Sequence, residues 1–123
     1  MSHYKCLTNL DIKDKNVNHA YKAVNELLNR WGLTFEEKSA LMGINSQENP
    51  IKFDSIVIKR IITVLDIDSE LKLYFNNPKN IFGYMTMVNN NPPFCGRKPL
   101  EIALASPEGL DTVYRYLCCM RAP

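Results

Sequence analysis

Residues 89–100 read NNNPPFCGRKPL, and the helical patterns of the chain are arranged on either side of this stretch. Asparagine and proline end the helical pattern that precedes it, and Pro92 and Pro93 lack the backbone donors that a strand ladder requires. Gly96 allows a backbone angle that a residue with a side chain resists. Pro99 suits the first turn of a following helix, where its missing N–H is not needed. The stretch therefore predicts a turn between two helices.

The same stretch places two adjacent cations, Arg97 and Lys98, beside the aromatic Phe94. Most loops rich in proline and glycine only connect elements, so these residues by themselves favour a simple connection. A binding role for the loop depends on what its neighbours in the chain indicate.

Size and composition bound the class of protein. The chain has 123 residues, 46% of them hydrophobic and 23% charged, with a net charge of +2. This predicts one domain, or two very small ones that share a core. The basic and acidic residues are spread evenly, with nine basic and seven acidic in residues 1–60 and six of each in residues 61–123. The balance gives no electrostatic argument for nucleic acid, an anionic membrane or a polyanionic substrate.

The four cysteines are Cys6, Cys95, Cys118 and Cys119. No pair has the spacing of a zinc site or a redox motif, which favours reduced thiols in a cytosol, with Cys118 or Cys119 partly buried. The first ten residues contain no apolar run that could act as a secretion signal, and no segment is long and uncharged enough to span a bilayer. We therefore expect a cytoplasmic protein without membrane contact.

Hydrophobic periodicity predicts helices throughout the first half. After a polar, mobile arm at residues 1–16, an apolar stripe at steps of three and four predicts a helix from Val17 to Trp31. A capping box at Thr34 predicts a short helix over residues 35–42, which Gly43 ends. At most a single turn is expected over residues 46–49. A helix rich in β-branched residues follows, capped by Asp54 or Ser55 and running to Ile67.

The second half continues the pattern. It predicts a short helix from Ser69 to Phe75, another over residues 79–88, a third from Pro99 to Ala105, and a last helix that Ser106 caps and Pro107 begins. No stretch alternates with period two over a useful length. The predicted fold is all-α, with seven or eight helices, most of them short.

Catalytic chemistry finds little support in the residues. The two histidines, His3 and His19, have no Cys, Asp or Glu at ligand spacing, so we expect no metal and no cofactor. No phosphate loop, nucleophile elbow or carboxylate pair is present. A thiol enzyme built on Cys95 and His19 stays open as an alternative, because catalytic partners need not be close in sequence. The expectation is a protein that is not an enzyme.

Residues 34–53 have the proportions of a helix-turn-helix. If this segment binds DNA, two polar residues would face base edges and three cations would meet phosphates: Ser46 and Gln47, then Lys52, Lys59 and Arg60. The alternative is that these are solvated faces of a helical bundle. Pro50 shortens the element that would enter the groove, and the near-neutral charge also argues against DNA binding by the isolated chain.

Five segments, taken in order, resemble one family. They are RWGLT with LMGI (residues 30–34 and 41–44), RIITVL (60–65), NIF (80–82), FCGRKPLE (94–101) and GLDTVYRYL (109–117). Together they look like the Xre-type antitoxins (MbcA/ParS/Xre family) of bacterial RES–Xre toxin–antitoxin systems. The resemblance covers roughly residues 17–121 and is strongest in the Gly-x-x-Pro-Leu-Glu loop and the Gly-Leu helix after it.

The resemblance implies an Xre-like helix-turn-helix domain at residues 17–68 and a small helical toxin-binding domain at residues 69–123. It implies a RES-domain toxin as partner, an enzyme that depletes NAD and whose active-site cleft the antitoxin blocks. The pair commonly represses its own operon, so operator DNA is a further implied partner, and such antitoxins tend to form homodimers and higher complexes with toxin.

Carried onto this chain, the implied toxin-binding residues are Phe94, Gly96, Arg97, Lys98, Tyr114, Arg115 and Arg121. Arginine can present a planar fork to carboxylates or to a pyrophosphate site, and aromatic residues and arginine commonly anchor interfaces. Two other interpretations stay open: a DNA-binding regulator whose C-terminal half only dimerises, and a relative that has kept the fold and lost its toxin.

Overall fold

The computed structural model describes residues 14–45 and 51–121. These residues form six α-helices and one short 3-10 helix and contain no β-strand, which confirms the all-α prediction. The elements are α1 (Asp14–Arg30), α2 (Phe35–Met42), α3 (Ser55–Tyr74), α4 (Pro78–Gly83), η2 (Tyr84–Thr86), α5 (Pro99–Ala105) and α6 (Gly109–Arg121).

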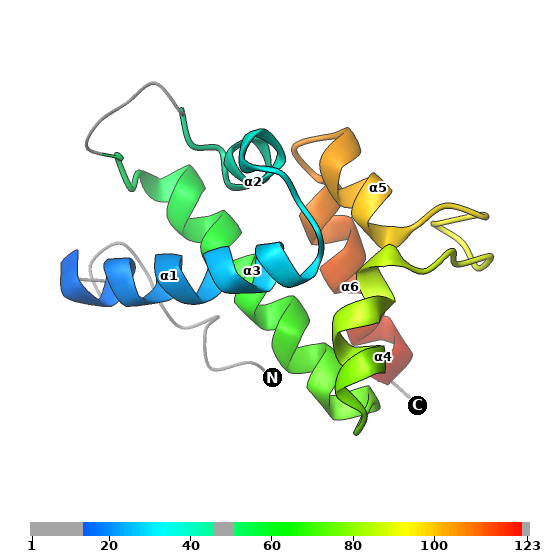
Figure 1. Cartoon of the computed structure of the whole chain (residues 1–123). Coiled ribbons are helices and arrows are strands. Elements are labelled where there is room, and N and C mark those ends of the chain that lie inside the picture. The colour runs from blue at the N-terminus through cyan, green and yellow to red at the C-terminus, as the bar shows by residue number, and fades with distance from the viewer. Residues whose placement is uncertain (1–13, 46–50, 122–123) are drawn as a thin grey trace.

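Helix α3 runs through the middle of the molecule. It packs against α1, α2, α4 and α6, while α5 packs against α6, α2 and η2 (Figure 1). Its β-branched residues Val57, Ile61 and Val64 are buried, at 1%, 2% and 0% exposure. Burial against several neighbouring helices stabilises more than the weak helix propensity of such residues costs, so the segment is helical.

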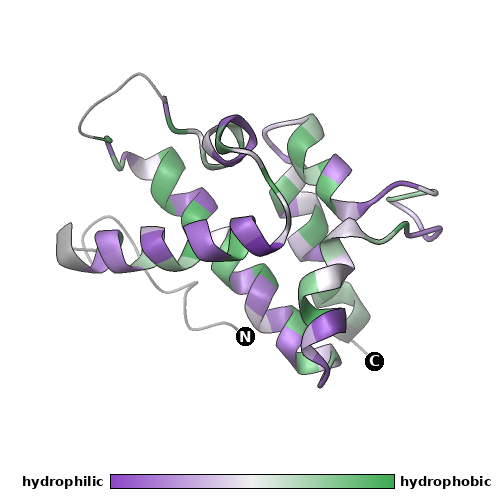
Figure 2. Cartoon of the chain, in the orientation of Figure 1, coloured by the Kyte–Doolittle hydropathy of each residue, from purple (hydrophilic) through white to green (hydrophobic). Residues whose placement is uncertain are grey.

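Buried side chains of both halves form one large cluster, and Val17 and Ile58 form a second, smaller one. The large cluster extends from Val24 and Trp31 in the first half to Val113 and Leu117 in α6. Hydrophobic and hydrophilic residues alternate along the helices, as expected for helices that are each buried on one side (Figure 2). The boundary expected between residues 68 and 69 lies inside α3, which crosses it without interruption. The two predicted portions therefore share a core.

Several predicted helix ends are confirmed in atomic detail. The Thr34 hydroxyl accepts from the Glu37 N–H at 3.1 Å, and the Glu37 carboxylate accepts from the Thr34 N–H at 2.9 Å. Gly43 ends α2 in the left-handed region, with a φ of 75°. The Asp54 carboxylate caps α3 by accepting from the Val57 N–H at 2.9 Å. These ends form because side chains satisfy backbone groups that the helix leaves without partners.

The expected separate helices at residues 54–67 and 69–75 are wrong, because α3 is one helix of 20 residues. Ser69 can cap a helix, but the segment around it is also buried on its inner side at Ile67, Glu70 and Leu71. On the outer side, Lys72 pairs with Asp68 at 2.8 Å, one helical turn apart. Continuing the helix preserves this packing, which a break at Ser69 would lose.

The helix expected over residues 79–88 is shorter in the structure. Helix α4 ends at Gly83, η2 adds one tight turn, and Met87 is extended, with φ and ψ of −98° and 137°. Val88, which follows Ile81 and Met85 at helical steps of four and three, is 60% exposed. The chain leaves the helix early because Asn89 pairs with Arg97 across the following loop.

Three further boundaries differ. Helix α1 begins at Asp14, inside the expected arm, while residues 1–13 lie outside the described residues. Ser106 ends α5 rather than capping the last helix, which begins at Gly109 and not at Pro107. The single turn expected over residues 46–49 also lies outside the described residues.

Candidate protein-binding site

Two backbone hydrogen bonds close the loop between η2 and α5. The Asn89 N–H donates to the Arg97 carbonyl at 3.0 Å, and the Gly96 N–H donates to the Asn89 carbonyl at 2.8 Å. Gly96 and Arg97 together face Asn89, the arrangement of a glycine-type β-bulge. The φ of Gly96 is 89°, which a residue with a side chain strongly resists. Gly96 therefore sets the backbone shape of the loop and has no side chain with which to contact a partner.

The tip of the loop is held from inside by Phe94. Its side chain is 0% exposed and meets the Tyr116 ring edge-on, with centroids 4.9 Å apart. The Phe94 and Cys95 N–H groups both donate to the Asn91 carbonyl, at 2.8 and 3.1 Å. The fully buried ring anchors the loop to α6 in this structure, and the contact of Phe94 with a toxin stays a prediction.

A second aromatic group supports the base of the loop. The Asn89 side-chain amide donates to the Tyr84 hydroxyl at 3.4 Å, and the Tyr84 ring lies 6.1 Å from the Phe75 ring between centroids. Burial, with a smaller contribution from nearby Tyr116, raises the pKa of Tyr84 to about 12. Tyr84 therefore stays neutral over the physiological range and acts as a hydrogen-bonding support.

The two cations of the loop face solvent. Arg97 and Lys98 are both exposed, and neither makes an ion pair within the described part of the chain. The Lys98 backbone N–H donates to the Glu101 carboxylate at 3.0 Å, which caps α5 and leaves the ammonium group in water. The loop thus combines a fixed backbone with two mobile cationic side chains.

The residues expected to bind from the last helix divide into two groups. Tyr114 is 8% exposed and belongs to the core, and its expected contact with a partner stays a prediction. Arg115 is exposed and pairs with Asp111 at 2.8 Å, one helical turn away, as their spacing indicates. Arg121 is the last residue of α6, and its side chain lies outside the described residues.

Two exposed apolar residues beside the loop were not predicted as site residues. Met87 and Val88 are 58% and 60% exposed and directly precede the paired Asn89. The loop stands out from the helices at the right-hand edge of Figure 1, so this apolar pair and the two cations lie on one projecting structure. The sequence signal was ambiguous for Val88, because this residue also fits a continuation of the preceding helical stripe.

Three of the five residues expected to contact DNA lie within the described part of the chain. Ser46 and Gln47 lie outside the described residues, and Lys52 and Lys59 are exposed. Arg60 donates from one guanidinium nitrogen to the carbonyls of Ala40 and Leu41, at 3.4 and 3.3 Å. Arg60 therefore caps the C-terminus of α2, where a cation is favourable.

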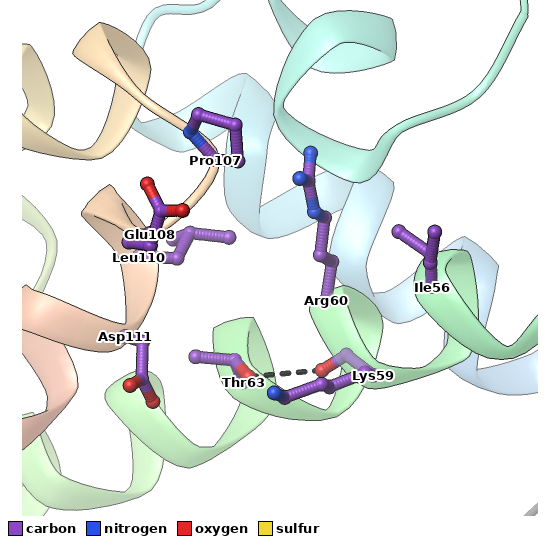
Figure 3. A pocket seen from close by; sticks show the side chains of 8 residues that line it. All are labelled: Ile56, Lys59, Arg60, Thr63, Pro107, Glu108, Leu110 and Asp111. Carbon is purple, nitrogen blue, oxygen red and sulfur yellow. Dashed lines mark hydrogen bonds between the residues drawn. The ribbon is translucent and has the colours of Figure 1, made fainter.

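Lys59 and Arg60 also line a cleft of about 300 Å³ between α3 and the start of α6. The opposite wall carries the carboxylates of Glu108 and Asp111, with the apolar Leu110 beside Glu108 and Pro107 on the side of Glu108 away from Asp111 (Figure 3). Carboxylates this close reduce the attraction of the two cations for a phosphate. A second cavity, of about 310 Å³, lies between α1, α3 and α4, where the Arg30 guanidinium covers the Phe82 ring at 4.3 Å.

Other chemistry is limited in the described residues. Cys95, Cys118 and Cys119 are free thiols, and the half-buried Cys118 donates to the buried Glu70 carboxylate at 3.3 Å. Within residues 14–45 and 51–121, no group of three or more His, Cys, Asp or Glu side chains could hold a metal ion. No described helix is both long and apolar enough to cross a membrane.

Comparison with protein-family models, with curated proteins and with solved structures finds no match to this chain. A function for the chain is therefore inferred from its residues and from the geometry of the loop.

Proposed function

We propose that the chain is an Xre-type antitoxin that binds a RES-domain toxin and keeps NAD out of its active-site cleft. The observation that carries the proposal is the loop at residues 89–98. Its apolar and glycine positions hold it in one shape, and its two cations are left exposed. A preorganised loop loses little conformational freedom on binding, which favours affinity.

The proposed mechanism is occlusion by binding, without catalysis by this chain and without a cofactor. A cleft that binds the pyrophosphate of NAD attracts cations, and the guanidinium of Arg97 can donate two parallel hydrogen bonds to a phosphate or a carboxylate. Lys98 adds a second charge next to it. The resemblance also assigns toxin binding to Arg115 and Arg121 of α6, and Arg115 pairs with Asp111.

The proposal includes an Xre-like helix-turn-helix portion in the first half, through which the complex would repress its own operon in the cytoplasm. Its support is α2, a short helix with a capping box at its start and Gly43 at its end, followed by the long α3. The interaction of Arg60 with the end of α2 argues that Lys59 would contribute more to phosphate binding than Arg60 does.

Co-expression with the product of the neighbouring open reading frame, expected to be a RES-domain protein, tests the proposal. We expect recovery of a stable complex, restored growth and a restored cellular NAD pool. The double variant Arg97→Glu, Arg115→Glu is expected to weaken the complex on the order of tenfold or more, as loss of interface anchors does. The matched control Lys59→Glu, Lys79→Glu changes the net charge equally on other elements. A wild-type chain that neither binds nor detoxifies the RES protein contradicts the proposal.

The competing function is a DNA-binding regulator without a toxin. If the chain makes a handful of phosphate contacts, the logarithm of its affinity for DNA falls as the logarithm of the salt concentration rises, with a slope of several units. Promoter DNA titrated with the chain alone over a range of salt concentrations measures this slope. Steep salt-dependent binding together with no toxin binding would favour the regulator over the antitoxin.

A further inference from the structure

The segment at residues 87–90 offers one backbone edge that the loop does not use. Met87 is extended, and the N–H and carbonyl of Asn89 both turn inward to the other arm of the loop. Successive backbone groups of an extended chain point to opposite sides, so those of Val88 point outward. Within the described part of the chain, the Val88 N–H and carbonyl and the Asn90 N–H have no hydrogen-bond partner. An open edge of this kind accepts an added strand.

The side chains around this edge define the chemistry of an occupant. Met87 and Val88 place two exposed apolar groups on the edge, at 58% and 60% exposure. Arg97 and Lys98, on the other arm, are exposed cations without an ion pair in the described residues. The Glu101 carboxylate accepts a hydrogen bond from the backbone N–H of Lys98. The surface therefore complements a segment that alternates acidic and apolar residues.

We propose that the 87–90 edge receives an extended, acidic segment of the partner protein, which pairs with the backbone of Val88 and places its carboxylates against Arg97 and Lys98. The inference deepens the proposed function and rests on it only for the identity of that partner, the RES-domain toxin. An extended segment fits better than a helix, because a helix uses its own backbone groups and would leave those of Val88 without partners.

Substitutions on the edge test the proposal in the complex with the RES protein. Val88→Asp places a carboxylate beside the expected acidic segment and is expected to weaken binding on the order of tenfold. Phe35→Asp is the matched control, because Phe35 is 61% exposed and lies in the first turn of α2, where a carboxylate is compatible with the helix. Val88→Pro removes the edge N–H and is expected to weaken binding while the thermal unfolding of the free chain stays unchanged. If Val88→Pro also unfolds the loop, the affinity of Val88→Asp and a peptide measurement decide whether the edge binds the partner.

A peptide measurement separates the edge from the identity of the partner. An amide spectrum of the full chain is recorded with a short peptide of alternating Glu and Val, and with a control of alternating Lys and Val. The proposal expects amide shifts at Val88 and Asn90 with the acidic peptide and none with the basic one.

The outcomes are distinct for the two proposals. If the RES protein binds but neither edge variant changes its affinity, the edge proposal is overturned and the antitoxin proposal stands. If the RES protein does not bind but the acidic peptide shifts the edge amides, the antitoxin proposal fails and the edge proposal stands. If the acidic peptide leaves the edge amides unmoved and the RES protein does not bind, both are overturned.

Discussion

Among the five glycines, Gly109 leaves the least room for an added side chain. A Cβ atom there would lie 2.0 Å from the Ile102 carbonyl oxygen and 2.8 Å from the Ala103 Cα atom, both parts of rigid backbone. The absence of a side chain lets the start of α6 approach the end of α5 closely. The Gly-Leu pair at residues 109–110 belongs to one of the five segments that carry the family resemblance. The close packing of α5 and α6 gives a physical reason for the glycine.

We expect Gly109→Ala to lower the free energy of unfolding by about 2–4 kcal/mol, because the backbone of α5 has to move to relieve the overlap. Gly83→Ala is the matched control. Gly83 has a helical backbone, and the nearest atom to an added Cβ is the Met87 sulfur at 3.9 Å. That control is expected to be neutral or slightly stabilising. Urea unfolding of both variants measures the difference, and equal stability of the two would contradict the account of the helix contact.

Tyr84 predicts a pH dependence in the alkaline range. Its pKa is raised from 10.0 to about 12, mainly by burial, so the folded chain keeps a proton that the unfolded chain releases. Its contribution is therefore fully present below pH 10.0 and is lost as the pH rises through about 12. Stability measured across this window is expected to fall less steeply in Tyr84→Phe than in the wild type. Identical slopes in the two proteins would show that another group is responsible.

At the scale of the element, α3 joins the two halves of the chain in one core. Its first half buries Val57 and Ile61, its second half buries Ile67 and Leu71, and all four belong to one core cluster. The family resemblance placed a domain boundary at residues 68 and 69, where the helix is continuous and Asp68 pairs with Lys72. A flexible linker at that position is not compatible with this geometry.

Asp68→Pro tests the continuity of α3. Proline inside a helix removes a hydrogen bond and collides with the preceding turn, which is expected to cost about 3 kcal/mol or more. Asn76→Pro is the control, because Asn76 follows the helix and the preceding Phe75 has the extended backbone that proline favours. Circular dichroism during thermal unfolding measures both. Equal tolerance of the two substitutions would mean that α3 is divided near residue 68 in solution.

At the scale of the whole molecule, the shared core predicts one cooperative unfolding transition. Trp31 is the only tryptophan, is 3% exposed and lies in the first half, while the Tyr74 hydroxyl donates to the Leu117 carbonyl and so joins α3 to α6. We expect the urea midpoint from Trp31 fluorescence to coincide with the midpoint from amide signals of α6. Two separated midpoints would show that the halves fold independently.

The sequence by itself determined the all-α class, the helix starts at Thr34 and Asp54, and the turn at Gly96. Each of these depends on residues within a few positions of one another, through hydrophobic period, capping groups or a required backbone angle. It also identified the loop at residues 89–100 and its two exposed cations, Arg97 and Lys98.

The tertiary structure decided which side chains the loop and the last helix leave on the surface. Phe94 resembles an interface anchor in the sequence yet is buried, while Val88 fits an apolar helical stripe and is exposed. Local pattern cannot separate these cases, because burial depends on contacts between residues far apart in the chain, such as Phe94 with Tyr116. The unbroken course of α3 has the same origin, since neighbouring helices on both sides of residue 68 cover its buried face.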